Sequence, residues 1–153
     1  MRRGRLLRDA ALMLVTGPAE AAGPPLPTEP PVLRAVPALL ETGMDWTGSR
    51  LMLAARADAL PVLARLVAAA GATVAGTAPL DDAGTLPRAL ASRIAAEAEA
   101  RRARLAAPEF DSVRLPPPLR RAALALPVRL TLPDPGPLDA TLRAAGLHCQ
   151  QDT

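Results

Sequence analysis

Aromatic side chains are almost absent from this sequence of 153 residues, which has one Phe, one Trp and no Tyr. Little aromatic area is therefore available for a core, which must be built from Leu, Val and Ala. Half of the residues are hydrophobic, which is enough for one domain of ordinary size. We expect a stability near the low end of the usual ~5–15 kcal/mol, because small side chains each bury little surface.

Three further absences each exclude a class of protein. Cys149 is the only cysteine, so the chain is not a disulfide-stabilised scaffold. The 18 prolines follow no period, which excludes a coiled coil and a collagen helix. No run of about 18 apolar residues occurs, so we expect no transmembrane span.

Lysine is also missing, and all 18 basic residues are arginine. The net charge of +3 comes from the N-terminus, where Arg2, Arg3, Arg5 and Arg8 precede any acidic residue. Without these four, 14 basic residues face 15 acidic ones, a balance of −1. The rest of the chain is therefore not a basic surface, and it has no aromatic side chains for stacking bases, so we expect no nucleic-acid partner.

The composition divides the chain into three segments. Residues 1–23 begin with basic residues, continue with apolar ones and end with small ones, which is the order found in a signal peptide. The apolar stretch at 10–15 is shorter than is usual for one. This stretch could instead hold a first strand, at 12–15. Residues 24–45 form a Pro-rich linker or an extended surface strand, and residues 46–150 form one α+β domain. We expect the protein in the cytoplasm, with export to the periplasm as the alternative.

A β-α-β unit is predicted directly after Trp46. Residues 50–56 and 72–78 have the composition of strands, and the helix between them covers 59–70. Its apolar residues recur at helical spacing, Asp58 is placed to cap it, and Gly71 is placed to end it. The residues expected on its apolar face are Leu60, Leu63, Leu66 and Val67.

A second unit of the same layout is predicted near the C-terminus. It has a strand at 126–132, a helix at 138–145 and a short last strand at 147–149. The longest helix is predicted between the two units, at 86–106, and the prolines at 116–118 interrupt the chain before one or two more helical turns. Together these elements predict an α+β fold with a ferredoxin-like split β-α-β sheet and an extra long helix between its halves.

Candidate catalytic residues are few. His148 and Cys149 are single and adjacent, so a strand would turn them to opposite faces, and no further His or Cys could complete a metal site. We therefore expect no metal, no cofactor and no catalytic residue, which favours a protein that is not an enzyme. The pair Asp81 and Asp82 reads as a turn. Strand alternation would point Phe110 inward and its two acidic neighbours, Glu109 and Asp111, outward.

The function expected from these observations is that of a non-enzymatic protein-binding or assembly module of a bacterial complex, with the cell envelope as one location. Its protein partner would contact the polar face of the long helix, at Arg101, Arg102 and Arg104. One alternative is a small anion- or ligand-binding domain, or an enzyme, that uses Arg56 and Arg129, which occupy related places in the two predicted units. Another is a poorly folded product of a GC-rich reading frame.

Overall fold

The computed structural model describes residues 10–16, 30–80 and 86–147. The chain divides into two compact units, one of Ala38–Arg129 and the other of Met1–Pro37 with Leu130–Thr153. The boundaries expected from composition, before residues 24 and 46, stay predictions.

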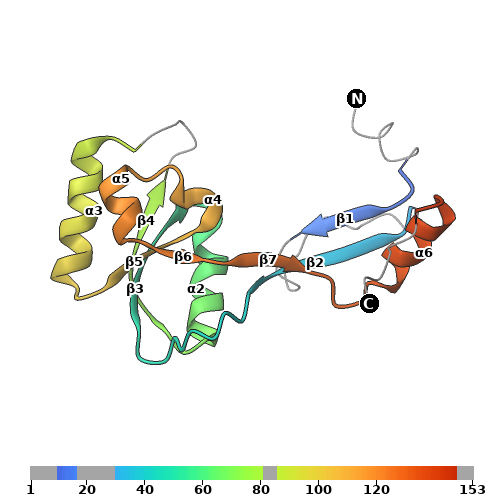
Figure 1. Ribbon diagram of the computed structural model, residues 1–153, viewed down its shortest axis with the longest axis horizontal. Coiled ribbons are helices and arrows are strands. Elements are labelled where there is room, and N and C mark those ends of the chain that lie inside the picture. The colour runs from blue at the N-terminus through green and yellow to red at the C-terminus, as the bar shows by residue number, and fades with distance from the viewer. Residues whose placement is uncertain (1–9, 17–29, 81–85, 148–153) are drawn as a thin grey trace. The chain divides into compact units, whose positions relative to one another are not determined.

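The unit of Ala38–Arg129 is built on a four-stranded sheet in the order β4-β3-β5-β6, in which the neighbouring strands run parallel (Figure 1). Two longer helices connect these strands, and two short helices follow β5. The elements in chain order are β3 (Arg50–Arg56), α2 (Leu60–Ala69), β4 (Thr73–Leu80), α3 (Arg88–Ala100), β5 (Arg104–Pro108), α4 (Glu109–Ser112), α5 (Pro117–Ala122) and β6 (Leu124–Leu126).

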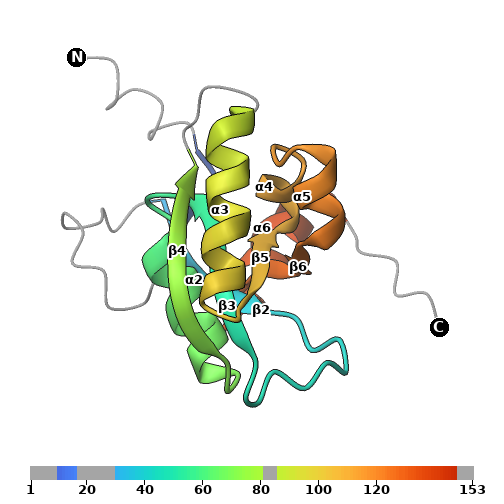
Figure 2. The same cartoon turned by 90° about the vertical axis from the view of Figure 1, so that its left-hand side faces the viewer.

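Strand β3 lies in the centre and is buried on both faces. Successive side chains of a strand point to opposite faces, so Leu51 and Leu53 join one hydrophobic cluster and Met52 joins the other. The first cluster also contains Leu63 of α2 and the second Ile94 of α3. The two helices therefore cover opposite faces of the sheet (Figure 2).

The predicted helix at 59–70 is confirmed as α2, and its buried residues are Leu60, Leu63 and Val67. Leu66 is only half-buried. The helix has no side-chain cap, because the Asp58 carboxylate instead accepts hydrogen bonds from the Arg56 guanidinium. Gly71 follows with a φ of +95°, the left-handed conformation expected of a glycine that ends a helix.

The prediction of one helix over 86–106 is wrong at its C-terminal end. Helix α3 stops at Ala100, and Arg102 turns the chain with a φ of +49°. The next residues form β5, which pairs with β3 through Leu105 opposite Met52 and Ala106 opposite Leu53. Burial between two neighbouring strands therefore overrides the high helix propensity of Ala, Leu and Arg.

The other unit contains a three-stranded sheet in the order β1-β2-β7. It contains β1 (Met13–Thr16) and α6 (Gly136–Ala144), and the division between the units falls within β2 (Val32–Leu39), after Pro37, and within β7 (Val128–Thr131), after Arg129. Strands β1 and β2 are parallel, and the Thr131 hydroxyl donates a hydrogen bond of 3.2 Å to the Val36 carbonyl. The alternative of a first strand at 12–15 is thus confirmed within one residue.

The α+β class is confirmed in its coarse sense, because helices and strands are mixed in two sheets. The ferredoxin-like arrangement is not confirmed, because the strands expected to share one sheet, at 50–56 and 126–132, lie in different sheets. The strand predicted at 147–149 lies outside the described residues, apart from Leu147. None of the helices in the described ranges combines the length and the hydropathy needed to cross a membrane.

Candidate functional site

The order of strands creates a switch point between β3 and β5. From β3 the chain passes through α2 to β4 on one side, and then through α3 to β5 on the other side of β3. In open parallel sheets, ligands bind outside the carboxyl ends of the strands at such a point. Arg56 ends β3 there and α4 begins there directly after β5, so the side chains of these two segments form the candidate site.

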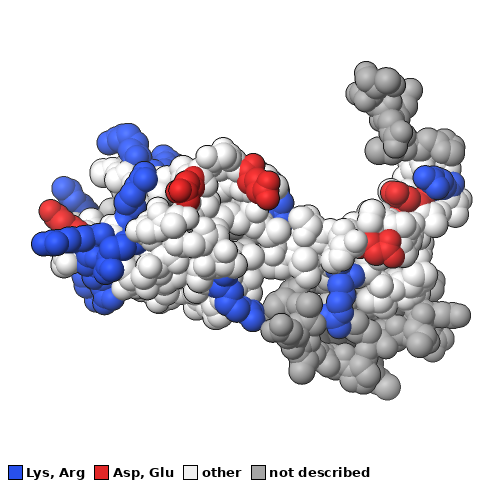
Figure 3. Space-filling view, turned by 90° about the horizontal axis from the view of Figure 1, so that it is seen from below, with Lys and Arg blue, Asp and Glu red and all other residues white. Residues whose placement is uncertain are grey.

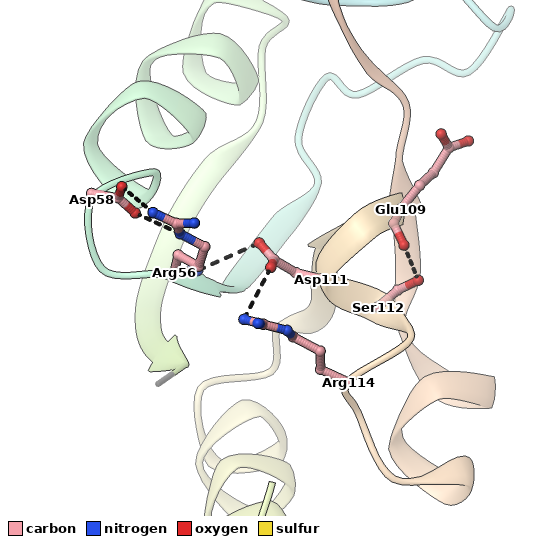
Figure 4. A network of polar contacts seen from close by, with 6 residues as sticks. All are labelled: Arg56, Asp58, Glu109, Asp111, Ser112 and Arg114. Carbon is pink, nitrogen blue, oxygen red and sulfur yellow. Dashed lines mark hydrogen bonds and ion pairs between the residues drawn. The ribbon is translucent and has the colours of Figure 1, made fainter. Parts of the chain in front are cut away.

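Asp111 is the buried charge of this site, with 4% of its surface exposed. Its Oδ2 accepts a long hydrogen bond of 3.4 Å from the backbone N–H of Arg56, and its Oδ1 lies 3.9 Å from the Arg114 guanidinium (Figure 4). Within the part of the chain that the structure describes, Oδ1 has no hydrogen-bond partner. A buried carboxylate is stable only when compensated. The hydrogen bond from Arg56 ties α4 to the end of β3, whereas Arg114 compensates the charge of Asp111 from the turn directly after α4.

The turn of α4 explains why Asp111 is buried. Residues three apart share a helix face, so Asp111 and Arg114 face inward and Phe110 faces outward with Val113. The Ser112 hydroxyl donates a hydrogen bond of 2.7 Å to the Glu109 carbonyl and closes the turn. The expectation of a buried Phe110 between two exposed acids is therefore wrong for Phe110, which is 74% exposed, and for Asp111, which is buried. It holds for Glu109, which is exposed.

Arg56 also contacts Asp58 at the same edge. Its Nε and a terminal nitrogen donate to the two carboxylate oxygens at 3.1 and 2.6 Å (Figure 4). These hydrogen bonds, aided by the positive charge of Arg56, lower the pKa of Asp58 below its ordinary value. The pair is bidentate, but both side chains are substantially exposed, so it adds little to stability.

Arg129 forms an ion pair of 2.6 Å with Glu109, the first residue of α4, and both side chains are about half-exposed. The two arginines predicted to hold an anion, Arg56 and Arg129, therefore contact different carboxylates. Each guanidinium keeps a solvent-exposed part next to α4 or to the end of β3. Their shared role in anion binding stays a prediction.

The three arginines predicted to contact a partner are divided between two elements. Arg101 and Arg102 follow the end of α3, and Arg104 begins β5. Arg101 forms an ion pair of 2.8 Å with Glu97 and donates to the Ala75 carbonyl, so it joins α3 to β4. Within the unit of Ala38–Arg129, basic side chains gather on the side where α3 lies (Figure 3). Partner binding by these residues stays a prediction.

The remaining candidates from the sequence lie outside the described residues, namely Asp81, Asp82, His148 and Cys149. Among the described residues, no group of three or more His, Cys, Asp or Glu side chains could hold a metal ion. Reasoning from sequence missed Asp111 and Arg114. One pattern in the sequence indicates them. Asp111 and Arg114 are three residues apart shortly after Pro108, and this spacing favours a helical turn over a strand.

The sequence analysis disfavoured an enzyme, but comparison with known proteins finds similarity to a kinase. The chain is 37% identical over 144 residues to a protein of Dinoroseobacter shibae that is named tetraacyldisaccharide 4'-kinase. The alignment covers 90% of this chain and 43% of that protein, so the chain spans less than half of its relative's length. No family model and no solved structure matches the sequence.

This similarity corrects the expected function. The sequence favoured a non-enzymatic protein-binding or assembly module, and that interpretation is wrong, because a relative aligned along most of the chain is named as an enzyme. The error arose from weighing His148 and Cys149 as the main carriers of chemistry. A kinase depends chiefly on charged groups that position a phosphoryl group and stabilise its charge, and arginine and aspartate supply such groups.

Proposed function

We propose that this chain performs part of the 4'-phosphorylation of an acylated disaccharide. The observation that carries the proposal is the 37% identity to a tetraacyldisaccharide 4'-kinase along 90% of the chain. The candidate site supports it, because the carboxyl edge at a switch point is where parallel sheets bind ligands.

The proposed role of the site is to bind the phosphorylated sugar. Guanidinium groups bind phosphate through charge-assisted hydrogen bonds, often in pairs. Arg56 and Arg129 offer partly exposed guanidinium groups at this edge, and buried Asp111 would act as a positioning residue that keeps α4 in place beside them. The sequence contains no lysine, so it contains no loop of the G-x-x-x-x-G-K-[ST] type for the phosphates of a nucleotide.

A binding experiment tests this role. The affinity of the purified chain is measured for tetraacyldisaccharide 4'-phosphate and for the unphosphorylated lipid, both carried in the same neutral micelles. We expect tighter binding of the phosphorylated lipid, and a loss of about tenfold for that lipid alone in Arg56→Ala and in Arg129→Ala, the size of one charge-assisted hydrogen bond.

Arg93→Ala is the matched control, since Arg93 is an exposed arginine of α3, away from the candidate site. We expect this variant to bind both lipids as the wild type does. Equal affinity of the wild-type chain for the two lipids would refute the proposed role.

A further inference from the structure

A groove lies at the opposite end of the strands from Asp111. Its walls are the segment Ala38–Trp46, which leads toward β3, and the last part of α2, at Leu66, Ala69 and Ala70. Helix α2 begins after the carboxyl end of β3 and ends before the amino end of β4, so this groove belongs to the amino edge of the sheet. Figure 1 shows the segment before β3 passing below α2.

The groove has the size and lining of a site for an apolar ligand. Its volume is 620 Å³, within the range of about 300–1,000 Å³ for small-molecule sites. Its walls include Leu40 and Met44, which are 41% and 45% exposed, and the only tryptophan, Trp46, which packs into the core beside α2. An apolar ligand that lies in the groove would remove the exposed surface of Leu40 and Met44 from water, which favours binding.

The rim of the groove indicates which head group the ligand carries. Glu41, Thr42 and Asp45 line it and are exposed. Hydrogen bonds from the backbone and hydroxyl of Thr47 lower the pKa of Asp45, so its carboxylate is charged at neutral pH. Two carboxylates repel the head group of an anionic phospholipid and accept hydrogen bonds from the hydroxyls of a neutral sugar.

We infer that this groove binds one alkyl chain of an acylated saccharide, with the sugar hydroxyls at the carboxylates of the rim. The chemical class of this ligand rests on the proposed function, because the kinase of Dinoroseobacter shibae is named for a tetraacyldisaccharide. The groove is a second site, distinct from the candidate site at Asp111. It would bind the protein to the same class of lipid on which the candidate site acts.

Trp46 reports binding, because it is the only tryptophan and it lines the groove. Its fluorescence is followed while the purified chain is titrated with octyl, decyl or dodecyl maltoside, each below its critical micelle concentration. Each pair of added methylenes should tighten binding about tenfold, and maltose alone should leave the fluorescence unchanged. An affinity that does not depend on chain length would overturn the inference.

Two variants locate the binding. Met44→Asp puts a charge on the exposed wall, and Ala69→Leu narrows the groove at an exposed position of α2. Both should weaken binding of dodecyl maltoside at least tenfold, whereas Leu147→Asp, which changes an exposed apolar residue outside the groove, should leave it unchanged. Wild-type affinity in both groove variants would contradict the assignment.

The two proposals fail separately. Dependence on chain length, abolished by Met44→Asp, supports the groove even if the chain does not distinguish the phosphorylated from the unphosphorylated lipid. If the protein binds the phosphorylated lipid more tightly but its affinity for maltosides does not depend on alkyl chain length, the candidate site is supported and the groove is refuted.

Discussion

Asp111 holds two segments together at the carboxyl edge, although both of its polar contacts are long. Replacing it with Ala removes a buried acceptor from Arg56 N–H and an ionic partner from Arg114. We expect Asp111→Ala to lower the free energy of unfolding by about 1–3 kcal/mol, measured by urea denaturation. The control Glu99→Ala, at an exposed position of α3, should change it by less than ~0.5 kcal/mol. Equal decreases in the free energy of unfolding of the two variants would show that the contacts of Asp111 do not stabilise the fold.

Asp58 provides a test by pH. Its pKa is lowered in the folded chain by the hydrogen bonds from Arg56, so the folded state binds the proton less readily than the unfolded chain does. The stabilisation is therefore complete above the ordinary carboxylate pKa of about 3.9 and is lost as the pH falls through the lower folded value. The difference in stability between wild type and Asp58→Asn should be small at pH 7 and should shrink further by pH 3. A difference that does not change with pH would contradict this account.

At the scale of the element, α2 depends on its buried face. Leu63 is 4% exposed in the cluster around Leu51 and Leu53, so Leu63→Asp buries a charge without compensation and should prevent folding. The same change on the opposite face, Ala68→Asp, should cost less than about 1 kcal/mol. Circular dichroism melting curves distinguish the two variants, and similar curves would show that the face is assigned wrongly.

The elements also show how far sequence reasoning reaches. The spacing of Leu60 and Leu63 and the position of Gly71 predict α2 because they are local signals. Strand β5 could not be predicted in this way, since Arg104 to Ala107 favour a helix locally and become a strand only through pairing with β3. The candidate site could not be predicted for the same reason, because it also depends on contacts between segments far apart in the sequence. Asp111 is buried by the position of a short helix after β5, which no periodicity in the sequence encodes.

For the whole molecule, the residues 38–129 contain both faces of the four-stranded sheet and all buried residues of its two clusters. We therefore expect a fragment of these residues to fold by itself. It should melt cooperatively and keep the blue-shifted emission of a buried Trp46, which is 6% exposed in the full chain. Emission typical of a solvent-exposed tryptophan would show that this unit needs the rest of the chain.

The central claim, that the chain does the work of the aligned segment of a tetraacyldisaccharide 4'-kinase, is tested most directly by exchange. The segment of the Dinoroseobacter shibae kinase that aligns with this chain is replaced by the chain, and phosphate transfer to the tetraacyldisaccharide is measured in the folded chimaera. We predict that the chimaera phosphorylates the lipid, and that changing both Arg56 and Arg129 to Ala lowers its rate by at least about tenfold. A chimaera that folds and still binds nucleotide, but transfers no phosphate to the lipid, would contradict the account.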